Sequence, residues 1–155
     1  MTKDLELLKR KQKGKQKLDM YKSTFMNHIK DSVWLDLEES DGILENLDSR
    51  FLGMITEDEL INSDESFIES DLMREIFMKA SESSESYVFG DDFYNCGIFK
   101  CLTKNALTNA FVIAESDSGN TVFILDKDYS FYFRINFNDS DHSDTPNKID
   151  IQKTS

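Results

Sequence analysis

Proline, cysteine and histidine are scarce in this sequence, which contains one, two and two of them, respectively. The single proline, Pro146, leaves no proline-rich linker between separately folded parts. Cys96 and Cys101 are too few for a disulfide framework or a four-thiolate zinc site. We therefore expect free thiols, with Cys101 buried in a strand, in a protein of the reducing cytosol.

Long apolar runs are also missing. No run approaches the roughly 20 residues that a membrane-spanning helix needs. The charged N-terminus lacks the apolar segment of a secretory signal peptide, so we expect none. A chain of 155 residues favours a single domain, 1–155, which can bury about two-thirds of its unfolded surface. Twelve phenylalanines, five tyrosines and one tryptophan supply bulky groups for its core.

Charge is abundant but unevenly distributed, with a formal net charge of −12. Residues 1–30 contain nine Lys or Arg and three Asp or Glu, whereas residues 31–99 contain three and nineteen. Residues 100–155 are closer to balance, with six and eight. A strongly acidic body repels nucleic acid and attracts basic proteins, so we expect a basic protein partner and neither a nucleic-acid nor a membrane partner.

The segment 1–16 is charged, and it contains most of the basic run Lys9–Lys17, interrupted by Gly14. Such a run can bind phosphate or an anionic membrane surface. A solvated helix face, or a frayed terminus that balances the acidic body, is the simpler interpretation. From residue 17 to 32, apolar side chains at helical spacing predict an amphipathic helix, with Leu18, Tyr21, Phe25 and Ile29 on one face.

The rest of the N-terminal half predicts further helices. Trp34, in a short strand or helix end at 33–37, is expected to anchor the core. Asp41 is expected to cap a helix with the apolar positions Ile43, Leu44, Leu47 and Phe51. Residues 56–59 and 66–69 have the form of capping boxes. The second box precedes a helix whose apolar face contains Met73, Ile76, Phe77 and Ala80.

The C-terminal half predicts antiparallel strands. A period of two predicts a half-buried strand whose inner face contains Phe131, Phe133, Ile135 and Phe137. Short apolar runs at 110–114 and 122–125, joined by a polar turn with Gly119, predict two further strands, and the three form a β-meander. Other strands are expected at 87–89, 97–103 and, at a sheet edge, 149–151. Helices first and strands later favour an α+β fold, with the helices on one face of the sheet.

Acidic residues are too frequent for any carboxylate pair to signal general acid–base catalysis, which needs two groups with divergent pKa values. The segment 115–126 starts and ends acidic like a calcium loop, but its glycine stands at the fifth place and apolar residues fill its end. Asp139, Asp141, His142 and Asp144 can in principle hold a divalent cation, although a polar turn is the simpler interpretation. We therefore expect no catalytic residue, no metal and no cofactor.

A protein-binding surface has more support. The segment Asp91-Asp92-Phe93-Tyr94 combines carboxylates, which pair with Lys and Arg and speed encounter, with aromatic rings that anchor an interface. We expect these four residues to form the main contact with a basic partner. Further contacts are expected in exposed acidic loops, at Glu82, Glu85, Asp139, Asp141 and Asp144.

The segments between residues 110 and 126 resemble part of a known family. A strand at Ala110–Glu115, a turn at Gly119-Asn120 and a strand at Val122–Asp126 are similar to the strand–glycine turn–strand–Asp core of the SUKH superfamily. Many bacterial members are immunity proteins that neutralise polymorphic toxins, including those of contact-dependent inhibition systems. The resemblance implies a protein that blocks a toxin without catalysis of its own.

The sequence as a whole predicts a cytosolic immunity protein that binds the C-terminal domain of a cognate toxin, expected to be a basic nuclease. Binding would cover the active site or the substrate surface of the toxin. Three alternatives stay open. One is a nucleic-acid-mimicking inhibitor of a DNA-binding host enzyme, one is docking of the basic N-terminal run on a membrane or RNA, and one is a hydrolase.

Overall fold

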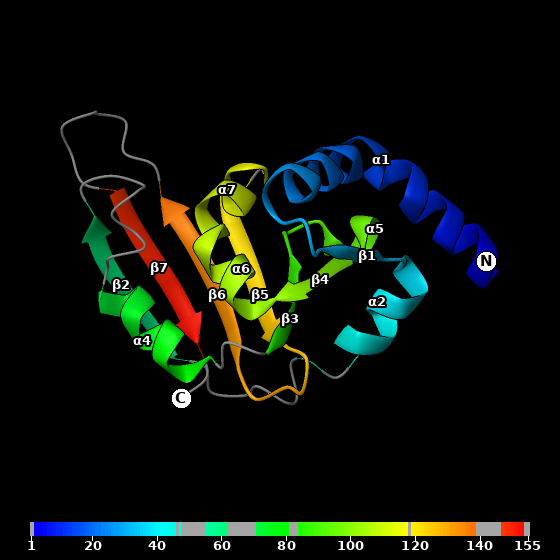
Figure 1. Ribbon diagram of the computed structural model, residues 1–155. Coiled ribbons are helices and arrows are strands. Elements are labelled where there is room, and N and C mark those ends of the chain that lie inside the picture. The colour runs from blue at the N-terminus through cyan, green and yellow to red at the C-terminus, as the bar shows by residue number, and fades with distance from the viewer. Residues whose placement is uncertain are drawn as a thin grey trace.

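The computed structural model describes residues 2–45, 47, 55–61, 71–80, 84–117, 119–138 and 147–153. The helices are α1 (Lys3–His28), α2 (Leu37–Leu44), α4 (Asp71–Lys79), α5 (Phe93–Cys96), α6 (Thr103–Thr108) and α7 (Ala110–Glu115). The strands are β1 (Val33–Leu35), β2 (Ile55–Ile61), β3 (Glu85–Phe89), β4 (Ile98–Leu102), β5 (Thr121–Asp126), β6 (Tyr132–Asn138) and β7 (Asn147–Lys153). These strands form one sheet in the order β1-β4-β3-β5-β6-β7-β2, and each neighbouring pair is antiparallel (Figure 1).

Both faces of the sheet are covered by helices. Side chains of a strand alternate between faces, so Val122 and Ile124 of β5 lie on one face and Phe123 and Leu125 on the other. The first face carries the larger hydrophobic cluster, to which α1, α4, α6 and α7 contribute. The second face carries a smaller cluster, to which α2 and α5 contribute. The predicted α+β class is confirmed, and the smaller cluster adds a helical layer that the sequence did not predict.

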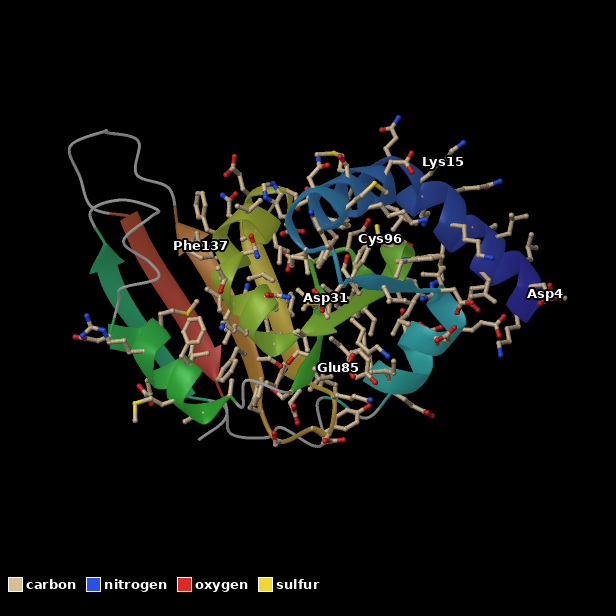
Figure 2. All side chains as sticks on the ribbon, in the orientation of Figure 1. Asp4, Lys15, Asp31, Glu85, Cys96 and Phe137 are labelled. Carbon is tan, nitrogen blue, oxygen red and sulfur yellow. The ribbon has the colours of Figure 1, made fainter. Side chains whose placement is uncertain are left out.

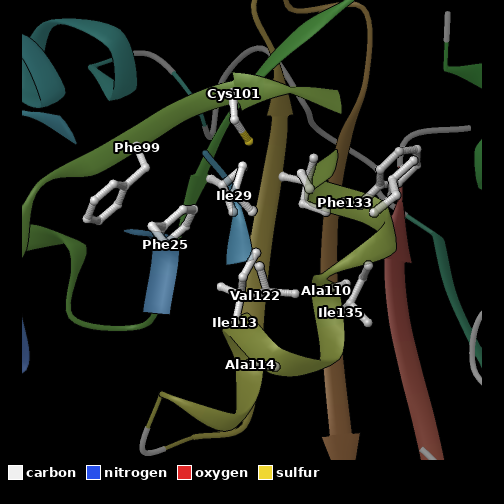
Figure 3. Close-up of a cluster of buried hydrophobic side chains, with 14 of the residues drawn as sticks. Phe25, Ile29, Phe99, Cys101, Ala110, Ile113, Ala114, Val122, Phe133 and Ile135 are labelled. Atoms are coloured by element: carbon white, nitrogen blue, oxygen red, sulfur yellow. The ribbon is translucent and has the colours of Figure 1, made fainter. Parts of the chain in front are cut away.

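The larger cluster joins the long helix α1 to the centre of the sheet (Figure 3). Phe25 of α1 stacks on Phe99 of β4 with the ring centroids 4.0 Å apart. Cys101, on the same face of β4, is buried with its thiol free, as predicted. Together these contacts fix the C-terminal half of α1 on the sheet. The N-terminal half of α1 packs against other helices of the protein.

The prediction of a strand at 110–114 is wrong, because these residues form helix α7. Ala110, Ile113 and Ala114 are buried, and their spacing of three and four residues is that of one helix face. A short apolar run without alternation suits a buried helix as well as a buried strand, so periodicity alone could not separate the two. The meander consists of β5, β6 and β7 instead. The strand on which the resemblance to the SUKH superfamily rested at 110–115 is therefore a helix.

Two helix starts were also misplaced. Asp36, not Asp41, caps α2, since its carboxylate accepts a hydrogen bond of 2.9 Å from the backbone N–H of Glu39. The segment 56–59 lies in strand β2, paired with β7, so its capping-box pattern is not used. The segment 66–69 and Phe51 lie outside the described residues. The helix predicted over Met73 to Ala80 is confirmed as α4.

Of the strands predicted outside residues 110–137, three are confirmed and one is only partly right. The strands at 87–89 and 97–103 are confirmed as β3 and β4, and the first residues of 33–37 form β1. Residues 149–151 lie in β7 as a strand. They are not at an edge, since β7 pairs with β6 on one side and with β2 on the other.

Residues 3–16 are not frayed, because they form the first half of α1. The Thr2 hydroxyl caps this helix by accepting a hydrogen bond of 3.2 Å from the N–H of Leu5. Leu7, Arg10 and Gly14 are buried against the rest of the protein. No helix within the described ranges is both long enough and apolar enough to cross a membrane.

Candidate functional site

The segment predicted to bind a partner, Asp91 to Tyr94, forms the turn after β3 and the start of the short helix α5, which lies against α1. Asp91 and Tyr94 are exposed, and Tyr94 retains 51% of its accessible surface. Asp92 and Phe93 are half-buried. Each of the four side chains has a partner inside the fold, and those partners determine what is left for another molecule.

Tyr94 is held by a buried arginine of α1. The Arg10 guanidinium lies 3.9 Å from the centroid of the Tyr94 ring, and its Nε donates a hydrogen bond of 2.7 Å to the Tyr94 carbonyl. The two terminal nitrogens of Arg10 donate to the carboxylate of Asp41 in α2, at 2.8 and 2.7 Å. The hydrogen bond to Asp41 raises the pKa of Arg10 despite the opposing effect of burial. Arg10 therefore joins α1, α2 and α5 at one point.

Asp91 lies beside a buried carboxylate, Asp117, which is only 2% exposed. Asp117 accepts hydrogen bonds from the hydroxyl of Tyr21 at 2.6 Å and from the N–H groups of Asp91 and Gly119 at 3.0 Å each. It thereby links α1, the turn after β3 and the turn before β5. Burial, and then its hydrogen bond to Asp117, raise the pKa of Tyr21 above its usual range. Tyr21 is thus a protonated donor and not a base.

The same cluster shifts the pKa of Asp91. Partial burial raises it first and the charge of Asp117 raises it further, while the cations of Arg134 and Lys17 oppose the rise. The Asp91 carboxylate is nevertheless exposed enough to meet a cation on a partner. A cationic partner group would relieve the repulsion between the two carboxylates, because an opposite charge favours the ionised form.

Phe93 and Asp92 serve the fold. The Phe93 ring packs edge-on against Phe89 and Phe123, with centroid distances of 5.2 and 6.4 Å. Asp92 precedes α5 and accepts a hydrogen bond of 2.9 Å from the side-chain amide of Asn95. The aromatic anchor expected at Phe93 is therefore part of the smaller core cluster. Only Asp91 and Tyr94 of this segment present exposed side chains.

Glu85 is the member of the second predicted group that the structure describes, and it does not lie at this place. Glu85 starts β3 and Asp91 follows the end of that strand, so the two lie roughly 15–20 Å apart at about 3.3 Å per strand residue. Figure 2 shows Glu85 below Cys96 of α5. Its carboxylate pairs with Lys127 at 3.4 Å. Four further candidates lie outside the described residues: Glu82, Asp139, Asp141 and Asp144.

An acidic helix face next to Tyr94 was missed. Glu38, Asp41 and Glu45 recur at spacings of three and four residues, so they lie on one face of α2 and its C-cap, and all three are exposed. No Lys or Arg occurs between residues 31 and 49. Because Arg10 bonds Asp41 and stacks on Tyr94, this face continues into α5. We call Glu38, Asp41, Glu45 and Tyr94 the α2–α5 acidic surface. The carboxylate spacing was a usable signal, hidden by the assignment of Asp41 as a cap.

The cysteines are poor nucleophiles. Burial raises the pKa of both Cys96 and Cys101 to about 12, and the neighbouring Asp92 carboxylate adds to the rise at Cys96. Both thiols are therefore protonated at neutral pH, and the thiolate is the reactive form. Across the described ranges, no three His, Cys, Asp or Glu side chains are grouped to hold a metal ion.

No protein-family model matches this chain, and no curated protein sequence matches it. The function is therefore inferred from the surfaces of the molecule itself.

Proposed function

We propose that this protein is an immunity protein of the cytoplasm, which binds the C-terminal domain of a cognate bacterial toxin and neutralises it without catalysis. The toxin is a basic enzyme of the nuclease class. The observation that carries the proposal is the α2–α5 acidic surface, a row of exposed carboxylates that ends at a half-exposed tyrosine. Binding there covers the active site or the substrate surface of the toxin.

Charge is the first support for this proposal. A nuclease binds a polyanion and therefore presents Lys and Arg around its substrate surface. The side chains of Glu38 and Glu45 are exposed, and the sequence contains no Lys or Arg between residues 31 and 49. Complementary charges speed encounter and fix the orientation of the two proteins. Exposed carboxylates of this kind act mainly on the association rate and on its dependence on salt.

Rigidity is the second support. The carbonyl of Leu35 accepts a hydrogen bond of 3.2 Å from the Ser40 hydroxyl, whose oxygen accepts one of 3.0 Å from the N–H of Ile98. This hydroxyl fixes the middle of α2 on the sheet, while Arg10 fixes Asp41. An interface that is ordered before binding loses less conformational entropy on association. Tyr94, held by Arg10, supplies the amphipathic aromatic group that tight interfaces favour.

The test is co-expression with the C-terminal domain of a toxin encoded immediately upstream. We expect the two to copurify, and titration calorimetry to show that Glu38→Lys combined with Glu45→Lys weakens binding at least about tenfold. The matched control is Glu115→Lys with Asp128→Lys, two exposed acids elsewhere that give the same change in net charge. Asp91→Lys tests the turn that the sequence favoured.

The possible outcomes separate the parts of the proposal. Equal weakening by both double variants would mean that net charge alone drives association, and would remove the α2–α5 acidic surface from the proposal. Loss of affinity only in Asp91→Lys would move the contact to the turn after β3. Absence of any complex with the upstream toxin domain would refute the immunity function.

A further inference from the structure

A groove runs beside α1 on the side that faces β1, and it consists of two hollows of 470 and 420 Å³ that share Trp34 as a wall. Phe25 and Phe99 form the apolar floor of the larger hollow. Leu18 and Leu37 line the smaller one. We call the two hollows together the α1 groove. The proposed function does not involve this groove, since none of the residues of the α2–α5 acidic surface lines it.

The rim of the α1 groove is basic. Lys11 and Lys15 border the smaller hollow, and Lys22 and Lys30 border the larger one. Lys11, Lys15 and Lys22 follow one another by four and seven residues, so they lie in one row along α1. Figure 2 shows the side chain of Lys15 pointing away from the body of the protein. Asp19 is the one carboxylate that lines either hollow among the described residues.

Exposed apolar side chains continue this lysine row at both ends. Leu8 lies three residues before Lys11, and Met26 lies four residues after Lys22, so both share the same helix face. Leu8 is 50% exposed and Met26 is 74% exposed. Asp19 lies in the same row between Lys15 and Lys22, so the row has apolar ends and a centre of three lysines and one aspartate, with a net charge of +2 above an apolar floor.

Trp34 is a fixed part of the groove. Its indole N–H donates a hydrogen bond of 2.9 Å to the carbonyl of Cys96, which sets the orientation of the ring. The ammonium of Lys22 lies 4.1 Å from the ring centroid in a cation–π contact. The lysine thus covers a face of the ring on which a planar ligand would otherwise stack.

We infer that the α1 groove docks an acidic, amphipathic peptide segment of a partner protein. Its carboxylates pair with Lys11, Lys15 and Lys22, and its apolar side chains fill the two hollows on either side of Trp34. Opposite charges around an apolar floor give such a segment both orientation and affinity. The partner charge needed here is opposite to that needed at the α2–α5 acidic surface, so the inference stands independently of the proposed function.

A nucleic acid is the less suitable occupant. Single strands gain affinity by stacking bases on exposed aromatic rings, and Lys22 covers the ring of Trp34. Outside residues 1–30, the chain carries nine Lys or Arg and 27 Asp or Glu. The negative electrostatic field of these residues repels a polyphosphate more than a short peptide.

The probe is a phage-displayed library of random 12-residue peptides without tryptophan, selected on the full-length protein. We expect the selected peptides to carry an excess of Asp and Glu together with two or more large apolar residues. Synthetic copies should change the emission of Trp34 on binding, and this signal is specific to the groove because the sequence contains one tryptophan.

The decisive variant is Lys11→Glu with Lys15→Glu, since both side chains are exposed and both border the smaller hollow. We expect it to weaken peptide binding at least about tenfold. The matched control, Lys9→Glu with Lys13→Glu, makes the same charge change on exposed positions of α1 that line neither hollow. It should retain binding within about threefold, because exposed single charges act weakly at a distance.

Three results would overturn the inference. One is a selection that enriches no acidic peptide, and another is equal loss of binding in the variant and its control. The third is tighter binding of a 12-nucleotide oligothymidylate than of any selected peptide, lost in Lys11→Glu/Lys15→Glu, which would assign the α1 groove to single-stranded nucleic acid. Equal far-UV circular dichroism and melting temperature of both variants establish that the comparison is between folded proteins.

Discussion

Two glycines in helix interiors predict opposite responses to the same substitution. Gly14 lies in the middle of α1, where a Cβ atom would run into the backbone carbonyl oxygen of Asn95 and stand 2.7 Å from its carbonyl carbon. Gly42 lies in α2, where a Cβ atom would meet no described atom within 4 Å apart from its chain neighbours and the backbone of its own helix. Gly→Ala in an open helix position stabilises by about 1 kcal/mol, because alanine orders at a lower entropic cost.

Whether Gly14→Ala stabilises or destabilises the protein therefore depends on the contact between α1 and α5. At Gly42 we expect the full gain of about 0.5–1 kcal/mol, which raises the melting temperature of a chain of this size by about 2 °C. At Gly14 the obstacle is backbone and cannot rotate away, so α1 and α5 must separate. Overpacking of this kind costs about 1–3 kcal/mol, and separation also weakens the bond from Arg10 to the Tyr94 carbonyl. We expect Gly14→Ala to lose about 2 kcal/mol net, or about 6 °C.

The assay is thermal and urea unfolding of wild type, Gly14→Ala and Gly42→Ala, followed by far-UV circular dichroism. Helix propensity is the same in both variants, so the difference between them isolates the close approach of α1 to α5. A Gly14→Ala protein as stable as Gly42→Ala would refute the reasoning, because α1 would then not lie against Asn95 as described.

Three further predictions follow from the buried and shifted groups. Arg10→Met should lower the free energy of unfolding by about 1–3 kcal/mol through loss of charge-assisted hydrogen bonds and ring stacking, and chemical denaturation will measure it; no change would mean that the bridge is solvated. The pKa of Asp91 is raised in the fold, so ionisation of this group opposes folding. Asp91→Asn should therefore have a higher melting temperature than wild type at pH 7, and this difference should disappear as the pH falls through the pKa of Asp91. A difference in melting temperature that does not change with pH would contradict this. Cys96 and Cys101, with pKa values raised to about 12, should resist Ellman's reagent at pH 8 until the protein is denatured, when both react; rapid reaction in the native state would count against their burial.

Local pattern carried a large part of the fold. The alternation over residues 131–137 predicted β6 and its apolar face, because a period of two is a property of the strand itself. The spacing over Tyr21, Phe25 and Ile29 predicted the buried face of α1 in the same way. Met73 and Ile76 likewise marked the core side of α4.

Segments without a distinctive period depended on tertiary contacts. The run at 110–114 suits a helix or a strand locally, and burial of Ala110, Ile113 and Ala114 against the sheet selects the helix. The acidic segment at 56–59 forms a strand because β7 pairs with it across the whole length of β2. Propensity is a weak preference that such pairing overrides.

By itself, the sequence determined the α+β class and the separation of a basic N-terminal segment from an acidic body, because both follow from composition and period along the chain. Only the tertiary structure decided what those charges do. Arg10 and Asp41 are thirty-one residues apart, and folding brings them into a bidentate pair that also holds Tyr94. The same folding packs the half-buried Phe93 against the smaller cluster and leaves Glu38 and Glu45 exposed. A side chain becomes available to a partner only through what its neighbours in space leave uncovered, and those neighbours come from distant parts of the chain.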